Sequence, residues 1–203
     1  EAATAGKIVR IYPAHDAQPI ENAGDGTEVA VICDVTAFHA EGGGQLGDIG
    51  TITAPTGVIE VTVTKKLPDG ATIMVGNVVE GVVNVGEEVT FAVQSNRKND
   101  IARNHTATHL LHAALKQVLG SHVNQAGSYV GPDRLRFDFS HFSQVTEAEL
   151  KEVEAIVNEE IQKSLPVVTE VMNIEDAKAS GATALFGEKY AEDVRVVTMG
   201  DFT

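Results

Sequence analysis

The chain changes character near residue 95, and this change limits the folds that it can form. Before this point, short runs of Val, Ile and Thr alternate with turns, whereas residues 97–119 contain neither Pro nor Gly. Apolar side chains recur at helical spacing in residues 97–119, which predicts a helix that ends at Gly120. We therefore expect an α+β chain, with a β-rich domain over residues 1–94 and a helix-containing domain over residues 95–203.

The β-rich domain is predicted to be a small barrel or sandwich. Turns such as residues 55–57 (PTG) and 68–70 (PDG) separate its runs, because Pro fixes φ and Gly accepts a positive φ. Many short strands at regular spacing are typical of both architectures. The predicted strands cover residues 29–36, 50–53, 58–64, 71–75 and 89–93.

The second domain is predicted to mix strands and helices. Thr146 and Glu149 fit a capping box, which begins a helix that residues 165–166 (LP) end. Strands are expected over residues 122–130, 135–140, 166–172 and 194–199, a short helix over residues 174–180, and a loop over residues 181–188.

The composition fits a globular protein of a reducing compartment. With 203 residues and 43% hydrophobic content, the chain can bury one large core or two small ones. It has no apolar run of transmembrane length and no signal segment at its start, so no membrane partner is expected. The single cysteine, Cys33, excludes an intramolecular disulfide, and we expect a cytoplasmic protein.

The charge balance limits the nucleic-acid partners that the chain can have. A formal net charge of -14 argues against broad nonspecific binding to DNA or RNA, which depends on Lys and Arg contacts to phosphates. A local basic patch stays open as an interpretation, and scattered surface charge is the alternative. The candidate positions for such a patch are residues 65–66, 97–98, 103, 134 and 136.

His105 and His109 are the candidate metal ligands. Their spacing puts both imidazoles on one face of the predicted helix, and neutral imidazole is a good zinc ligand. No Glu follows His105, so the motif is not that of the zinc proteases. Because a zinc site needs at least three protein ligands, a purely structural role for the pair stays open. His112 and Cys33 are each either a further ligand or a packing residue.

Residues 40–48 form a glycine-rich loop after a predicted strand. Its three consecutive glycines, residues 42–44, permit the backbone to approach a ligand or another segment closely. The loop matches neither GxGxxG nor a P-loop, so a nucleotide phosphate is not expected there. The alternative interpretation is a β-bulge or a tight corner of a barrel.

Several segments together resemble the editing region of bacterial alanyl-tRNA synthetase. In chain order they are residues 41–48 (EGGGQLGD), 103–112 (RNHTATHLLH), 125–128 (QAGS), 134–141 (RLRFDFSH) and 184–190 (ALFGEKY). The free-standing alanyl-tRNA editing proteins share part of this pattern, and the last two segments favour the synthetase. The resemblance implies a small β-barrel followed by an α/β editing domain.

The resemblance also implies a reaction and its residues. The family hydrolyses the ester that links serine or glycine wrongly to tRNA(Ala), as is needed when a binding pocket cannot reject near-isosteres. Thr36 resembles a threonine whose hydroxyl helps to recognise the serine side chain. His105 and His109 match zinc ligands, and Thr108, Gln125 and Ser128 match positions that line the pocket.

The end of the sequence departs from the family pattern. The remaining zinc ligands of the family come from a Cys-x-x-x-His segment a few residues beyond 200–202, and this sequence stops at Thr203. We therefore expect a piece without the ATP-binding aminoacylation domain, in which Zn²⁺ binds weakly or not at all. The alternatives are a tRNA-binding module that truncation has inactivated, a threonyl-type editing domain, and a zinc hydrolase unrelated to tRNA.

Overall fold

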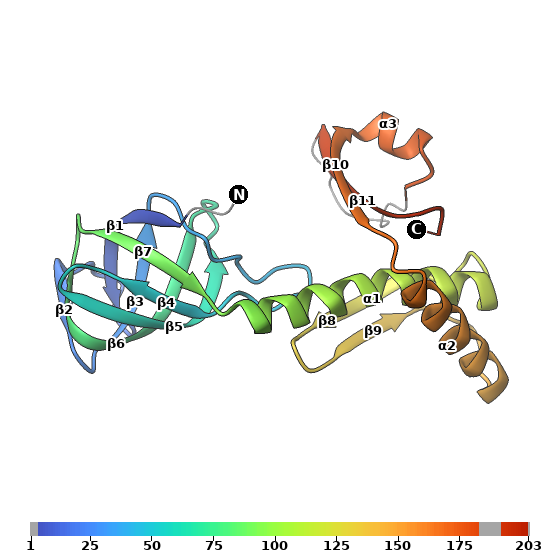
Figure 1. The fold of residues 1–203 in the computed structure, drawn as a ribbon, viewed down its shortest axis with the longest axis horizontal. Helices are drawn as coiled ribbons and strands as arrows, with labels where there is room; N and C mark the ends of the chain where they lie inside the picture. Colours follow the sequence, from blue (N-terminus) through green and yellow to red (C-terminus); the bar gives the residue numbers. More distant parts are fainter. Residues whose placement is uncertain (1–3, 183–191, 203) are drawn as a thin grey trace. The chain divides into compact units, whose positions relative to one another are not determined.

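The computed structural model describes residues 4–182 and 192–202, and within these ranges the chain forms two compact units (Figure 1). We call the first the barrel unit; it comprises Glu1–Ala102 and Tyr129–Asp133. The second unit comprises Arg103–Ser128 and Arg134–Thr203. The loop predicted over residues 181–188 and the resembling segment at 184–190 lie largely or wholly outside the described residues.

Seven strands build the barrel unit. They are β1 (Ala5–Pro13), β2 (Asn22–Gly24), β3 (Glu28–Cys33), β4 (Gly50–Thr53), β5 (Gly57–Lys66), β6 (Thr72–Asn84) and β7 (Glu88–Val93). The sheet runs in the order β2-β6-β3-β1-β7-β4-β5, and β5 also pairs with β6. This last pairing closes six strands into a barrel, with β2 added beside the far end of β6. The prediction of a small barrel is confirmed.

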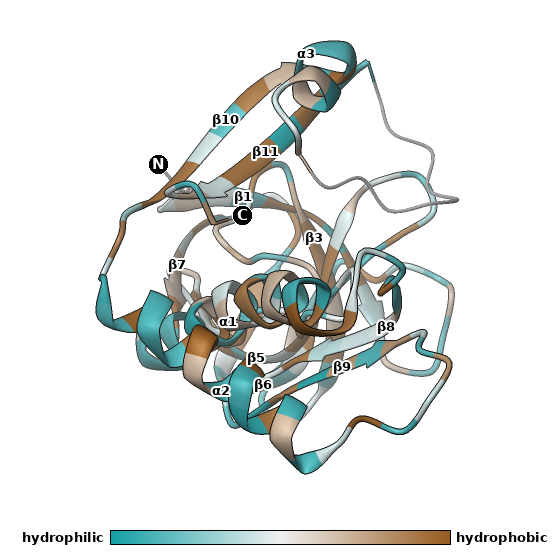
Figure 2. Ribbon diagram, turned by 90° about the vertical axis from the view of Figure 1, so that its right-hand side faces the viewer, coloured by the Kyte–Doolittle hydropathy of each residue, from teal (hydrophilic) through white to brown (hydrophobic). Residues whose placement is uncertain are grey.

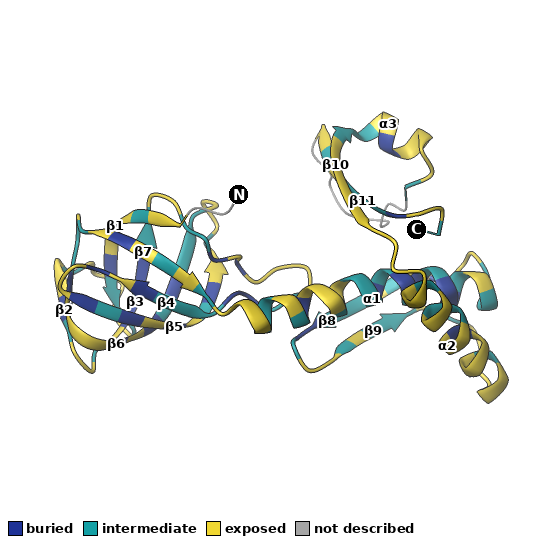
Figure 3. Ribbon diagram, in the orientation of Figure 1, coloured by how far each residue is buried: buried dark blue, intermediate teal, exposed yellow. Residues whose placement is uncertain are grey.

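The barrel encloses an apolar core (Figure 3). In β5 buried and more exposed residues alternate from Gly57 to Thr62, as expected for a strand with one face inward. Fully burying each large aliphatic side chain contributes about 1.5–3 kcal/mol. The largest buried side chains are Ile8, Ile11, Val29, Val31, Ile52, Ile59, Val61, Met74, Val78, Val83 and Val89.

Strands β1 and β2 were not among the predicted strands. The register of β1 against β3 shifts between Ile8 and Arg10, so the two fully buried residues are Ile8 and Ile11, three positions apart. This bulge breaks the two-residue alternation from which a strand is predicted. The other missed strand, β2, has only 3 residues, too few to show a pattern.

The remaining elements alternate as the sequence predicts. They are α1 (Ser95–Leu119), β8 (Gln125–Val130), β9 (Leu135–Phe139), α2 (Glu147–Gln162), β10 (Val167–Asn173), α3 (Ile174–Ala179) and β11 (Asp193–Met199). The capping box is confirmed, because Thr146 accepts from the amide of Glu149 and the Glu149 carboxylate accepts from the amide of Thr146. β8 pairs with β9, and β10 pairs with β11.

The second unit has its own apolar core. Ala114 and Leu115 of α1 are buried in one cluster with Val123 and with Val153 of α2. Phe137 of β9 packs against the same cluster. The apolar face predicted for α1 therefore serves to bury the helix.

The small sheet of β10 and β11 carries exposed apolar residues (Figure 2). Val171 is 73% exposed, and Val167 and Val168 are also exposed. None of the helices in the described residues is both long enough and apolar enough to cross a membrane.

Candidate functional site

His105 and His109 lie side by side on α1. Their ring centroids are 5.1 Å apart and their planes are inclined by 34°. Two imidazoles whose nitrogens bind a tetrahedral zinc ion at about 2.0–2.1 Å have ring centres roughly 5 Å apart. The rings are therefore adjacent, as the four-residue spacing predicts, and their role as zinc ligands stays a prediction.

The environment of His109 favours the form of imidazole that binds metals. His109 is half-buried, and burial lowers its pKa below the ordinary histidine value. The positive charge that His112 can carry lowers the pKa of His109 further. The neutral form therefore predominates at pH 7, with a nitrogen lone pair available for coordination.

His112 is a packing residue. It is 9% exposed, its ring lies 5.0 Å from that of Phe137, and its Nε2 lies 3.3 Å from the carbonyl oxygen of Val123. Burial lowers the pKa of His112, so this histidine is also held neutral. These contacts account for the burial of His112 without a role in metal binding.

Cys33 also packs inside its unit. It lies against the core of the barrel, and burial, reinforced by the charge of Asp34, raises the pKa of its thiol to about 12. A thiolate, the form that binds metals and attacks carbonyls, is therefore scarce at pH 7. Among residues 4–182 and 192–202, no group of three or more His, Cys, Asp or Glu side chains is arranged to hold a metal ion.

Thr108 lies in α1 between the two histidines. Its side chain is buried, and its hydroxyl donates a hydrogen bond of 2.8 Å to the carbonyl oxygen of Asn104, one turn earlier. This local bond fixes the rotamer of the hydroxyl and leaves its lone pairs to accept a hydrogen bond.

Gln125 and Ser128 are half-buried residues of β8. They are three positions apart, and successive side chains of a strand point to opposite faces. Gln125 and Ser128 therefore leave opposite faces of β8, so a pocket on one face is lined directly by one of them.

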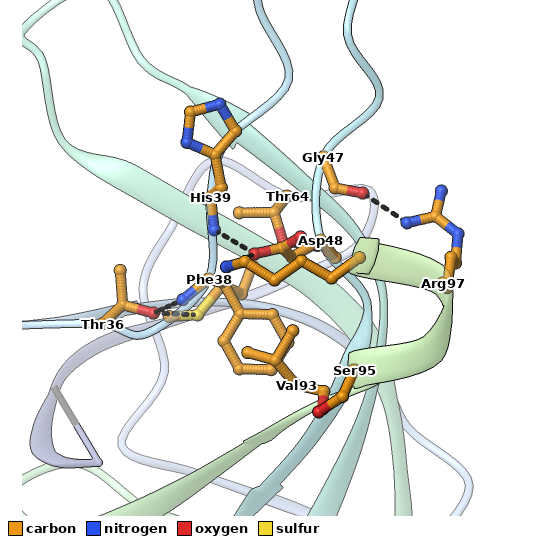
Figure 4. A network of polar contacts seen from close by, with 11 residues as sticks. Thr36, Phe38, His39, Gly47, Asp48, Thr64, Val93, Ser95 and Arg97 are labelled. Carbon is orange, nitrogen blue, oxygen red and sulfur yellow. Dashed lines mark hydrogen bonds and ion pairs between the residues drawn. The ribbon is translucent and has the colours of Figure 1, made fainter. Parts of the chain in front are cut away.

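Thr36 belongs to the barrel unit and follows β3. Its Oγ1 accepts a hydrogen bond of 3.1 Å from the amide of Phe38 and lies 3.1 Å from the sulfur of Met74 (Figure 4). Sulfur is a weak acceptor, so the hydroxyl hydrogen can turn to a better one. The Thr36 hydroxyl is thus held in place but retains hydrogen-bonding capacity.

The glycine-rich loop is a tight hairpin. Gly42 and Gln45 exchange two backbone hydrogen bonds of 3.1 and 3.0 Å, and Gly43 and Gly44 between them have φ values of 60° and 83°. Positive φ at both central residues is typical of a type I′ turn. We call residues 42–45 the glycine hairpin. The structure thus shows a tight turn within the loop, and the close approach of this loop to a ligand stays a prediction.

The same loop also makes a close backbone approach. A Cβ atom at Gly47 would collide with the carbonyl oxygen of Thr64, so only glycine fits there. The amide of Leu46 donates to the carbonyl oxygen of Val130, and the amide of Val130 donates to that of Gly44. The loop thus packs against other segments of the barrel unit.

Asp48 and Lys98 form an ion pair that the sequence analysis missed. The Asp48 side chain is 3% exposed, and its Oδ2 lies 2.7 Å from Nζ of Lys98. The neighbouring guanidinium of Arg97 donates to the carbonyl oxygen of Gly47 at 2.8 Å (Figure 4). Residues 97–98, a candidate basic patch, are therefore engaged with the loop that ends in Asp48.

The sequence analysis also missed a second pair of adjacent histidines, His122 and His141. Nε2 of His122 lies 2.8 Å from Nδ1 of His141, and their ring centroids are 5.0 Å apart. The ring of Phe142 lies 4.7 Å from each of them, although Phe142 itself is 83% exposed. Nothing in the local spacing of these residues signals that they meet.

Comparison with family models first indicates the class of protein to which the barrel unit is similar. The family model described as tRNA synthetases class II (A) matches residues 1–97, which include all strands of the barrel. This match concerns the barrel unit and the first residues of α1.

The particular relatives are alanine–tRNA ligases. The chain is 53% identical over 188 residues to the alanine–tRNA ligase of Geobacillus thermodenitrificans. The aligned region covers 93% of this chain and 21% of the relative. The chain is 50% identical over 188 residues to the ligase of Bacillus subtilis, with coverage of 93% and 21%. It is 49% identical over 203 residues to that of Geobacillus kaustophilus, with coverage of 100% and 23%.

These matches extend over both units of the chain. The chain spans about a fifth of the length of these relatives. The similarity to alanyl-tRNA synthetase that the motifs predict is therefore confirmed, while editing stays a prediction.

Proposed function

We propose that the chain is the editing part of an alanyl-tRNA synthetase and hydrolyses the ester of serine or glycine on tRNA(Ala). The observation that carries the proposal is the pair of adjacent imidazoles of His105 and His109, which fits one zinc ion, in a chain similar to alanine–tRNA ligases. The reaction adds water across the ester and releases the free amino acid and tRNA(Ala). A cytoplasmic location follows from this role.

The proposed site uses His105 and His109 as metal ligands. Zn²⁺ bound there would polarise the substrate or fix its position, with its remaining ligands supplied from outside the described residues. Thr108, between the two histidines, would accept a hydrogen bond through its free lone pairs. Gln125 or Ser128 would contact the aminoacyl group from β8.

We propose that water, rather than a protein nucleophile, attacks the ester carbonyl. Burial keeps the thiol of Cys33 protonated, and the hydroxyl of Thr108 donates to the carbonyl of Asn104 rather than to a base. An ester is easier to hydrolyse than an amide, so orientation of water and electrostatic stabilisation of the oxyanion are sufficient.

A tRNA-binding module without hydrolysis is the second candidate function. It is favoured by the absence of a third metal ligand beside His105 and His109 in the described residues. A threonyl-type editing domain is less well supported, because the glycine hairpin precedes the histidines and the relatives are alanine–tRNA ligases.

Release of serine from Ser-tRNA(Ala) tests the proposal, with a seryl ester of adenosine assayed in parallel. We expect rapid release from the tRNA ester and slow release from the nucleoside ester. Binding of tRNA(Ala) without release would favour the binding module. Equal activity on both esters would indicate a hydrolase that does not recognise tRNA.

A further inference from the structure

The sheet of β10 and β11 has one face that the described residues leave open. Residues that pair directly across an antiparallel sheet point to the same side, so the register puts Val167, Val171 and Val197 on one face. Val171 is 73% exposed and Val167 is 48% exposed, and Figure 3 shows most of β10 as exposed. We call these three valines, together with Thr169 and Arg195 on the same side, the open face.

The opposite face of the sheet is covered next to α3. It carries Met172, Val194 and Val196, which are half-buried, and α3 contacts both strands. Ala177 of α3 is buried. Adjacent residues of β10 therefore differ sharply, because Met172 is half-buried on this face whereas Val171 is exposed on the open face.

A two-stranded sheet with an uncovered apolar face is an incomplete packing unit. Such a sheet is at best marginally stable in water, and an apolar sheet face is normally buried against a further layer. In the described part of the chain neither β10 nor β11 pairs with a third strand. Contiguous exposed apolar side chains of this kind mark an interaction surface.

Length and charge indicate what covers the open face. The aligned region makes up only 21% of each relative, so about four-fifths of such a ligase lies outside it. A second copy is disfavoured, because each copy has a formal net charge of -14 and like net charges repel.

Arg195 adds a chemical requirement for the covering segment. It is exposed, it lies directly across from Val171, and it forms no ion pair within residues 4–182 and 192–202. An acidic side chain at the rim of the covering segment would pair with this guanidinium.

We propose that the open face is an internal interface of a complete alanyl-tRNA synthetase. A segment of the ligase outside these 203 residues packs apolar side chains on Val167, Val171 and Val197 and places an acidic side chain against Arg195. This inference rests on the part of the proposed function that assigns the chain to a synthetase, and it does not depend on hydrolysis.

The reactivity of a cysteine placed on the open face tests the proposal. Val171→Cys introduces the thiol, and Cys33, the only native cysteine of the chain, packs against the barrel core with little thiolate at pH 7. Alkylation at residue 171 is followed by peptide mass spectrometry in the 203-residue chain and in a complete ligase that contains it. The rate should be roughly 100-fold slower in the complete ligase, because the covering segment excludes the reagent until it opens.

Matched variants separate cover from other causes. Glu152→Cys, at an exposed position of α2, should react at rates within about twofold of each other in the two proteins. Arg195→Glu, added to Val171→Cys, should speed alkylation in the complete ligase by roughly tenfold and leave the rate in the 203-residue chain unchanged. Arg195→Lys keeps the charge and should change neither rate.

Equal alkylation at residue 171 in the two proteins would overturn the inference, because the face would then be open in the ligase as well. Slow alkylation in the 203-residue chain would also overturn it, and sedimentation would then distinguish a second copy from cover within one chain. A rate in the ligase that Arg195→Glu leaves unchanged would contradict the acidic partner. A ligase that protects residue 171 but releases no serine from Ser-tRNA(Ala) would support the interface and reject the proposed hydrolysis.

Discussion

At the scale of single residues, Thr36 offers a direct way to examine how serine is recognised. Its hydroxyl accepts from the amide of Phe38 and lies 3.1 Å from the sulfur of Met74, a weak acceptor. We predict that Thr36→Val lowers deacylation of Ser-tRNA(Ala) more than that of Gly-tRNA(Ala), by roughly tenfold, because glycine has no hydroxyl to recognise. Comparison of kcat/KM on the two substrates measures the effect.

Equal loss on both substrates would contradict a role of Thr36 in recognising the hydroxyl. Such a result would indicate instead that Thr36 maintains the conformation of the turn. Thr36→Ser keeps the hydroxyl and is the matched control, expected to retain the preference for serine.

His109 and His112 make the second unit sensitive to acid. Burial is the first cause that lowers the pKa of each below the ordinary value of 6.5. An unfolded chain therefore binds protons more readily than the folded chain as the pH falls below 6.5, so the free energy of unfolding falls in that range. Above pH 6.5 both states hold neutral imidazoles, and this contribution to stability is fully present.

Denaturant unfolding between pH 8 and pH 5 measures this effect. We predict that His112→Gln flattens the fall in stability below pH 6.5. A slope unchanged by His112→Gln would show that other groups cause the acid sensitivity.

At the scale of secondary-structure elements, α2 depends on its capping box. The hydroxyl of Thr146 accepts from the amide of Glu149 at 3.3 Å, and the Glu149 carboxylate accepts from the amide of Thr146 at 2.7 Å. Thr146→Ala should lower the free energy of unfolding of the second unit by about 1 kcal/mol, as for other N-caps. Thermal unfolding measures it, with Glu152→Gln on the same helix as control; an equal effect of both changes would exclude the cap as the cause.

Local patterns predicted most elements because each depends on near neighbours in the sequence. The helical spacing and the absence of Pro and Gly predicted α1, and turn residues marked the boundaries between β4 and β5 and between β5 and β6. β1 escaped prediction because a bulge between Ile8 and Arg10 interrupts its alternation.

The candidate site could be predicted only where its geometry is local. The spacing of His105 and His109 predicts their adjacency, because a helix brings such positions together. Asp48 and Lys98 are 50 positions apart, and each alone resembles an ordinary solvated charge. Only the fold of the barrel unit brings these two residues into contact.

At the scale of the whole molecule, we predict that the 203-residue chain binds zinc weakly or not at all. His105 and His109 fit two ligands, but a tetrahedral ion needs at least three from the protein, and the described residues offer no such group. Elemental analysis after dialysis against a chelator measures the content. One tightly held zinc per chain would contradict the prediction and indicate a further ligand.

The chain is much shorter than the relatives to which it is similar. It spans about a fifth of the alanine–tRNA ligases to which it is similar. Aminoacylation, ATP binding, contact with tRNA(Ala) and zinc-dependent deacylation are therefore to be measured on a complete ligase.

The most direct test of the central claim is the ratio of kcat/KM for Ser-tRNA(Ala) to that for Ala-tRNA(Ala), measured with a complete ligase that contains this chain. We predict hydrolysis of the seryl ester with a preference of roughly 100-fold or more over the alanyl ester, because the site gains a hydrogen bond to the serine hydroxyl that the larger-than-glycine methyl side chain of alanine cannot make. His105→Ala should remove the seryl activity. Equal hydrolysis of both esters, or hydrolysis of neither, would contradict the assignment as an editing hydrolase.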